Sequence, residues 1–116
     1  MTTTDLADDN VVFLRGRLAA APVTRALPSG DEIVSFRLTV DRPAAANDTR
    51  ARVDSIDCAT AAPRVRRCVE RAEPGECLEV HGALQRRFWR SSGNLGSRYE
   101  VVVATAKLSR RRRSDA

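Results

Sequence analysis

The chain has 116 residues, of which 42% are hydrophobic, and it carries 20 Lys or Arg against 15 Asp or Glu, a formal net charge of +5. This length allows one domain with a modest core, and no apolar run approaches the roughly 20 residues of a membrane-spanning helix. The N-terminus is Thr-rich and acidic, unlike a secretory signal peptide. We therefore expect a cytoplasmic protein without membrane contact, whose basic surface favours polyanions as partners.

The cysteines and the single histidine indicate no cofactor chemistry. Cys58, Cys68 and Cys77 form no Cys-x-x-Cys pair and are odd in number, so neither a zinc site nor a disulfide framework is expected. We expect buried free thiols, no metal and no other cofactor. His81 is predicted on the outward face of a strand beside Glu79, without a nucleophile or an acid–base partner, so the sequence predicts no enzyme.

The two ends differ in charge from the body of the chain. Residues 1–9 contain Asp5, Asp8 and Asp9 and predict a flexible N-terminal arm. Residues 109–116 contain four consecutive arginines and Asp115 and predict a basic, disordered end that either clamps a polyanion or only solubilises the chain. Residues 10–108 form the predicted folded domain.

Three segments alternate between apolar and polar residues, which is the period of a half-buried β-strand. They are residues 10–18, 32–41 and 53–60. The expected inward row of the first strand is Val12, Leu14, Gly16 and Leu18. The outward rows of the first two strands carry Arg15, Arg17 and Arg37.

Turn residues and a helical stripe fill the gaps between these strands. Pro22 and the Leu-Pro-Ser-Gly sequence at 27–30 predict a loop with a turn, and residues 43–51 predict a second loop. Pro63 opens a short predicted helix, which Pro74 and Gly75 end. Its apolar stripe is Val65, Cys68, Val69 and Ala72.

Residues 76–106 predict a long β-hairpin with a basic, aromatic tip. The expected inward row of its first strand is Leu78, Val80, Gly82 and Leu84. The next five residues, Arg86-Arg87-Phe88-Trp89-Arg90, surround the only tryptophan with guanidinium groups. Residues 91–96 predict a flexible turn, and residues 99–106 predict the return strand. Guanidinium groups pair with phosphates and an indole stacks on bases, so this tip suggests single-stranded nucleic acid.

The first half of the chain resembles a known family. The segments are Asn-Val-Val-Phe-Leu-Arg-Gly-Arg-Leu at 10–18, Ala-Pro-Val-Thr-Arg at 21–25, Leu-Pro-Ser-Gly at 27–30 and Val-Ser-Phe-Arg-Leu-Thr-Val at 34–40. Their order resembles the opening of bacterial single-stranded DNA-binding proteins, and a weaker similarity continues to about residue 108. The chain is most similar to a short, tailless paralogue of this family.

Pattern and resemblance imply the same fold. Three strands, a helix and two further strands are the order of an OB-fold, an all-β five-stranded Greek-key barrel with one short helix. The resemblance implies a homotetramer, with a dimer as the second expectation. It also implies non-sequence-specific binding and protection of single-stranded DNA in replication, recombination or repair by a nucleoid-associated protein. RNA is a second expected ligand, because stacking and phosphate contacts scarcely distinguish the sugars.

The residues expected to bind DNA come from two regions. Those of the hairpin are Arg86, Arg87, Phe88, Trp89 and Arg90, and those of the first two strands are Arg15, Arg17 and Arg37. A groove between the two regions would let arginines follow the phosphates. The family carries a stacking aromatic in this hairpin, and Trp89 occupies its place.

The other aromatic residues receive different expectations. Phe88 shares parity with Leu84, so an inward orientation is the alternative for it. Tyr99 shares parity with two strand valines and is expected in the core or in an interface. Phe13 is assigned to an interface or to the ligand without preference, and Phe36 to the core.

Two departures from the family affect the functional prediction. Ala44 and Ala61 stand near positions where relatives commonly carry aromatics, so we expect an affinity that depends mainly on charge and falls with salt. The C-terminal end is basic, whereas relatives carry an acidic tip, so recruitment of repair proteins by such a tail is not expected. Two alternatives stay open: a primosomal accessory OB-fold protein that acts through protein contacts, and a structural oligomeric barrel that has lost strong DNA binding.

Overall fold

The computed structural model describes residues 8–43 and 52–109. Most of the predicted N-terminal arm and basic C-terminal end lies outside these ranges, as does Ala44. The described elements are β1 (Val12–Leu18), β2 (Val23–Ala26), β3 (Glu32–Asp41), β4 (Val53–Thr60), α1 (Pro63–Arg71), β5 (Cys77–Ser91) and β6 (Asn94–Leu108).

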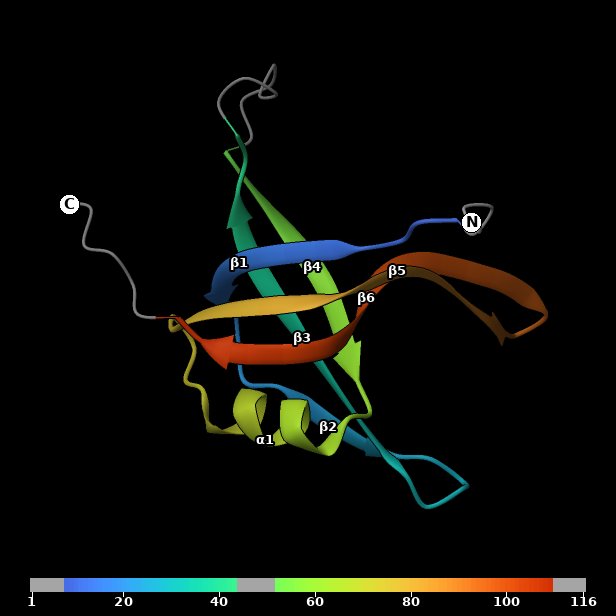
Figure 1. Cartoon of the computed structure of the whole chain (residues 1–116). Coiled ribbons are helices and arrows are strands. Elements are labelled where there is room, and N and C mark those ends of the chain that lie inside the picture. The colour runs from blue at the N-terminus through green and yellow to red at the C-terminus, as the bar shows by residue number, and fades with distance from the viewer. Residues whose placement is uncertain (1–7, 44–51, 110–116) are drawn as a thin grey trace, which may run out of the picture.

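The strands form a closed five-stranded barrel with one short helix, as the sequence predicts (Figure 1). β1 pairs with β5, β5 with β6, and β3 with β4, all antiparallel. Two short seams close the barrel. β1 meets the second half of β3 at Arg17–Thr39 and Leu18–Leu38, and β4 runs parallel to β6 at Cys58–Val101 and Ala59–Val102.

The inward rows of the strands form the core. Leu18, Leu38, Leu78 and Val80 are almost completely buried, and Phe36 lies in the same cluster, as expected. α1 covers one end of the barrel with the predicted stripe, since Val65, Val69 and Ala72 are buried and Cys68 packs against them. The thiols are free, but only Cys58 is fully buried; Cys68 and Cys77 are half-buried.

β2 corrects the predicted loop that follows Pro22. Val23 to Ala26 pair with the first half of β3, from Val23–Ser35 to Ala26–Glu32. All four residues of β2 are exposed. The strand therefore has no buried row and no alternation of apolar residues, which is why its sequence resembles a loop.

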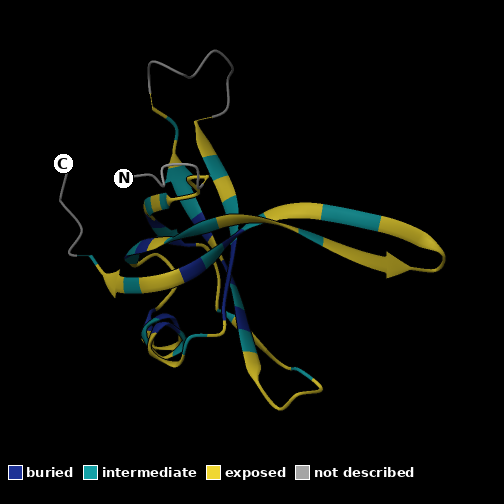
Figure 2. Cartoon of the chain, turned by 45° about the vertical axis from the view of Figure 1, so that its right-hand side comes forward, coloured by how far each residue is buried: buried dark blue, intermediate teal, exposed yellow. Residues whose placement is uncertain are grey.

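The β5–β6 hairpin extends well beyond the barrel (Figure 2). We call its residues 84–100 the arm. The predicted flexible turn over residues 91–96 is wrong, because pairing continues to Ser91–Asn94 and leaves two turn residues. Ser92 and Gly93 both have positive φ, 52° and 82°. This is the conformation of a tight two-residue turn that matches the twist of paired strands.

Two features fix the arm where it leaves the barrel. The register of β5 and β6 shifts between His81 and Gly82, which marks a bulge. A Cβ on Gly82 would lie 2.0 Å from the Val102 carbonyl oxygen, so only glycine fits this approach. Asn10 then binds the main chain of Leu84 twice at 2.8 Å, as its side-chain amide donates to the carbonyl and its oxygen accepts from the N–H. Leu84 starts the arm and is half-exposed rather than inward as expected.

Candidate nucleic-acid interface

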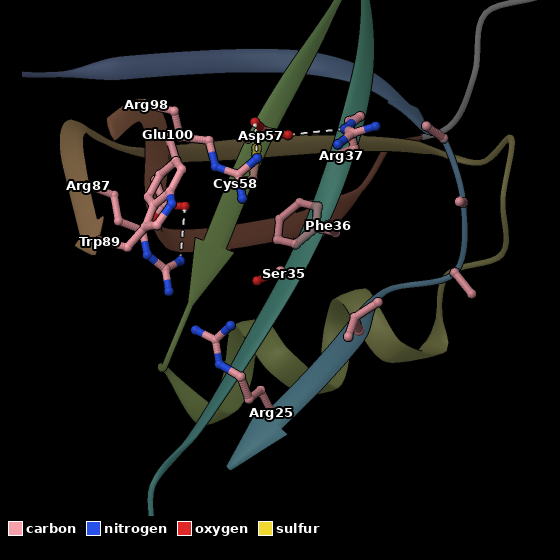
Figure 3. A pocket seen from close by; sticks show the side chains of 14 residues that line it. Arg25, Ser35, Phe36, Arg37, Asp57, Cys58, Arg87, Trp89, Arg98 and Glu100 are labelled. Atoms are coloured by element: carbon pink, nitrogen blue, oxygen red, sulfur yellow. Dashed lines mark hydrogen bonds and ion pairs between the residues drawn. The ribbon is translucent and has the colours of Figure 1, made fainter. Parts of the chain in front are cut away.

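An open cleft of about 500 Å³ lies between the barrel and the arm (Figure 3). β2 contributes Arg25, β3 contributes Arg37, and the arm contributes Arg87, Trp89 and Arg98. Phe36 and Cys58 also line it, so the barrel core reaches the cleft floor. An indole and four guanidinium groups from four strands thus face one space.

Trp89 is held against the arm by its neighbours in the other strand. Gly96 is its cross-strand partner, and a Cβ there would lie 2.6 Å from Cε2 of the indole. The Arg98 guanidinium carbon lies 5.5 Å from the ring centroid, which is cation–π distance. Trp89 remains 42% exposed, so the ring is positioned and still accessible to a base.

Two carboxylates orient three of the cleft arginines. Asp57 accepts from Arg37 at 3.0 Å and lies 3.5 Å from Arg98, while Glu100 lies 3.6 Å from Arg87. Arg25 forms no ion pair with any residue that the structure describes. Four arginines against two carboxylates leave the cleft a net charge of +2. Arg37 and Arg98 are more than half exposed, so their pairs with Asp57 contribute little stability and these guanidinium groups can exchange the carboxylate for a phosphate at small cost. The Arg87 pair is more sheltered, because Glu100 is only 11% exposed.

The Cys58 thiol in the cleft is held in its neutral form. Burial, with smaller effects from Asp57 and Glu100, raises the pKa of the Cys58 thiol to about 12, so it is not a thiolate nucleophile near neutral pH. The only histidine, His81, lies elsewhere with its ring 4.7 Å from that of Phe13. Within residues 8–43 and 52–109 no cluster of acidic, Cys or His side chains could hold a metal ion, and no helix is long and apolar enough to span a membrane.

The eight residues predicted to bind DNA do not share one surface. Arg37, Arg87 and Trp89 line the cleft. Arg86, Phe88 and Arg90 alternate with them along β5 and therefore face the opposite side of the arm. The five consecutive residues of the predicted tip thus divide between two faces.

Arg15 and Arg17 lie outside the cleft and have acidic partners. Arg15 donates to Glu79 at 2.9 Å, and this hydrogen bond, followed by one from Ser109, holds the Glu79 pKa below its usual value. Lys107 lies 3.7 Å from the same carboxylate. Arg17 donates to Asp41 at 3.2 Å. Both arginines point outward as predicted, but their partners Glu79 and Asp41 are also outside the cleft.

The remaining aromatic expectations receive mixed answers. Phe88 is 58% exposed, so the alternative of an inward ring is wrong. Tyr99 is also 58% exposed and is not part of the core, because it pairs with Arg86 on the arm rather than inside the barrel. Phe13 is exposed beside His81. Ala61 is exposed and does not line the cleft.

Two arginines of the cleft were not predicted from the sequence to bind DNA. Arg25 lies on the unpredicted strand β2, and Arg98 lies opposite Arg87 on β6. A two-residue turn at Ser92-Gly93 would have fixed this hairpin register and placed Arg98 on the face of Trp89. For Arg25 the sequence contains no comparable signal.

The chain matches a known protein family and a solved structure. The model of the single-strand binding protein family matches residues 9–109. No curated protein matches the chain. A solved structure described as a Plasmodium falciparum SSB complex with ssDNA has the same fold, with a TM-score of 0.75 and 17% identity, over 92% of this chain and 100% of that one. Because the family model covers nearly all described residues, the chain belongs to the single-strand binding protein family.

Proposed function

We propose that the protein binds single-stranded DNA without sequence preference and shields it during replication, recombination or repair, without making or breaking a bond. The observation that supports this most strongly is the accessible Trp89 ring beside four arginines in one cleft. Indole stacking tolerates any base, and guanidinium groups follow the backbone. Family membership is consistent with this ligand.

The chemistry of binding follows from the cleft. A base stacks on the open face of Trp89, while Arg98 holds the ring in place. Neighbouring phosphates bind Arg25, which has no ion pair among the described residues, and share Arg37 and Arg87 with their carboxylates. Trp89 is the exposed aromatic ring of the cleft, since Phe36 is buried. One such ring supplies roughly 1–3 kcal/mol of stacking per base, so charge contributes much of the affinity.

Assembly is a further part of the proposal. Phe13 on β1 is about half exposed, and Val11, the residue just before β1, is 81% exposed. Covering these side chains by another copy would remove apolar surface from water. We propose a homotetramer of a cytoplasmic protein, with a dimer as the second possibility; sedimentation equilibrium of the full chain distinguishes the two from a monomer.

The direct test is titration of the intrinsic fluorescence of Trp89, the only tryptophan, with oligo-dT at low and high salt. We expect strong quenching that high salt weakens. In parallel, anisotropy of labelled DNA should show that Trp89→Ala lowers affinity about 5- to 150-fold, the equivalent of losing roughly 1–3 kcal/mol of stacking.

Leu108→Ala is the matched control, because Leu108 is similarly exposed at the far end of β6, outside the cleft. Weak binding that is equal in wild type and Trp89→Ala, without quenching, would contradict the proposed function. Competition with oligo-U in the same assay measures the preference between DNA and RNA.

A further inference from the structure

The back face of the arm carries the same types of side chain as the cleft but points away from it. We define the back face as the exposed side chains of the arm on the side opposite the cleft, namely Leu84, Arg86, Phe88, Arg90, Leu95 and Tyr99; Ser97 lies on the same side and is half-buried. All six are exposed, and the arm projects from the barrel (Figure 2). The face therefore combines aromatic rings with guanidinium groups.

Arg86 is preorganised between two aromatic rings. Its guanidinium carbon lies 5.4 Å from the Phe88 centroid and 5.2 Å from the Tyr99 centroid. Its N–H groups donate to the Ser97 hydroxyl at 3.0 Å and to the Tyr99 hydroxyl at 3.4 Å. These partners are neutral, so they fix the side chain without cancelling its charge.

The two faces of the arm differ in whether their arginines have carboxylate partners. In the cleft, Arg87 and Arg98 have carboxylate neighbours. On the back face no position is acidic, and neither Arg86 nor Arg90 forms an ion pair with any described residue. An apolar protein surface covering this face would bury two uncompensated cations, which is costly. A ligand with flat apolar rings and regularly spaced negative charges satisfies both features.

We propose that the back face is a second contact for single-stranded DNA, with a base against Phe88 and phosphates on Arg86 and Arg90. This inference rests on the proposed function of the cleft. The arm ends in the two-residue turn at Ser92-Gly93, so one strand leaving the cleft can pass around its tip to the other face. A short strand occupies the cleft alone, whereas a longer strand occupies both faces.

The test compares Phe88→Ala and Trp89→Ala with oligo-dT of about 8 and about 30 nucleotides, lengths within and beyond the range that one OB-fold covers. We expect Phe88→Ala to bind the short strand as wild type does and the long strand about 5-fold or more weakly. Trp89→Ala should weaken both. Quenching of Trp89 by the short strand in Phe88→Ala shows that the cleft is intact.

Leu108→Ala should leave the affinity for both lengths unchanged. Wild-type affinity of Phe88→Ala for the long strand, together with loss in Trp89→Ala, would overturn the back-face contact and leave the proposed function standing. A change in assembly mass of Phe88→Ala without a change in DNA affinity would assign this face to contacts between copies. Absence of binding by the wild type would instead remove the proposed function itself.

Discussion

A glycine positions the ring that carries the proposed function. Gly96 lies under Trp89, and a side chain there would overlap the indole. The same pairing places Arg98 beside the ring from the next alternate position. Trp89 lies on β5, and the two residues that hold its ring lie on β6.

We expect Gly96→Ala to displace the indole and to lower affinity for oligo-dT about 10-fold, an effect within the range of a lost stacking contact. Fluorescence titration and DNA anisotropy measure the change, and circular dichroism should show an unchanged fold. Ser91→Ala, an exposed substitution on the same face of the arm, is the control. Wild-type affinity of Gly96→Ala would show that the ring does not depend on this contact.

The raised pKa of Cys58 predicts low reactivity. Burial favours the neutral thiol, and with a pKa of about 12 the thiolate remains scarce until strongly alkaline pH. We expect Cys58 to resist iodoacetamide at pH 8 in the folded protein and to react in urea, as peptide mass spectrometry can show. Because the unfolded chain releases this proton near pH 9, the free energy of unfolding should fall as pH rises above that value. Rapid alkylation in the native state would refute this assignment.

At the scale of elements, the arm depends on how it leaves the barrel. The bulge at His81/Gly82 turns the hairpin, and Asn10 holds the main chain of Leu84 just before β1 begins. The Asn10 side chain, which precedes β1, thus adds two hydrogen bonds to β5 beyond the backbone pairing of β1 with β5. The direction of the arm, and with it the width of the cleft, follows from these residues.

We expect Asn10→Ala to lower the free energy of unfolding by about 1 kcal/mol, because two exposed hydrogen bonds are lost. Hydrogen exchange at the Leu84 amide should accelerate more than exchange in the barrel core. Asp9→Ala, which removes a neighbouring exposed side chain, should leave both quantities unchanged. Equal exchange in Asn10→Ala and wild type would show that the arm is held by other contacts.

Sequence patterns predicted the elements with a buried row and missed those without one. β1, β3, β4 and α1 have apolar residues at the required spacing, because one face of each enters the core. β2 and the tip of the arm are exposed on both faces, so burial imposes no alternation on them. The candidate site could be predicted only in part for the same reason. Trp89 stands out in the sequence as the only tryptophan, but the sequence does not show that Trp89 and Phe88 point to opposite faces of the arm, because both faces there are exposed to solvent.

At the scale of the whole molecule, charge sets the expected response to salt. If Arg25, Arg37 and Arg87 each meet a phosphate, the slope of log affinity against log salt should be about −2, since each contact with a single strand contributes roughly −0.7. We expect Arg37→Ala to reduce the slope by about 0.7 in magnitude. Arg64→Ala on the exposed side of α1 is the control. An unchanged slope in Arg37→Ala would place the phosphates elsewhere.

The short seams give the barrel a mechanical weak point. The backbone pairing of β4 with β6 is limited to Cys58–Val101 and Ala59–Val102, with the Thr60 hydroxyl donating to the Val103 carbonyl beside it, whereas the β3–β4 and β5–β6 hairpins are paired along their length. Unfolding of the barrel should therefore begin with the separation of β4 from β6. The cleft spans the boundary between these two strands, with Asp57 on β4 and Arg98 on β6. A DNA strand bound in the cleft would contact both β4 and β6 and hold them together. Oligo-dT should accordingly slow unfolding in urea, measured by stopped flow, and an unchanged rate would show that opening begins elsewhere.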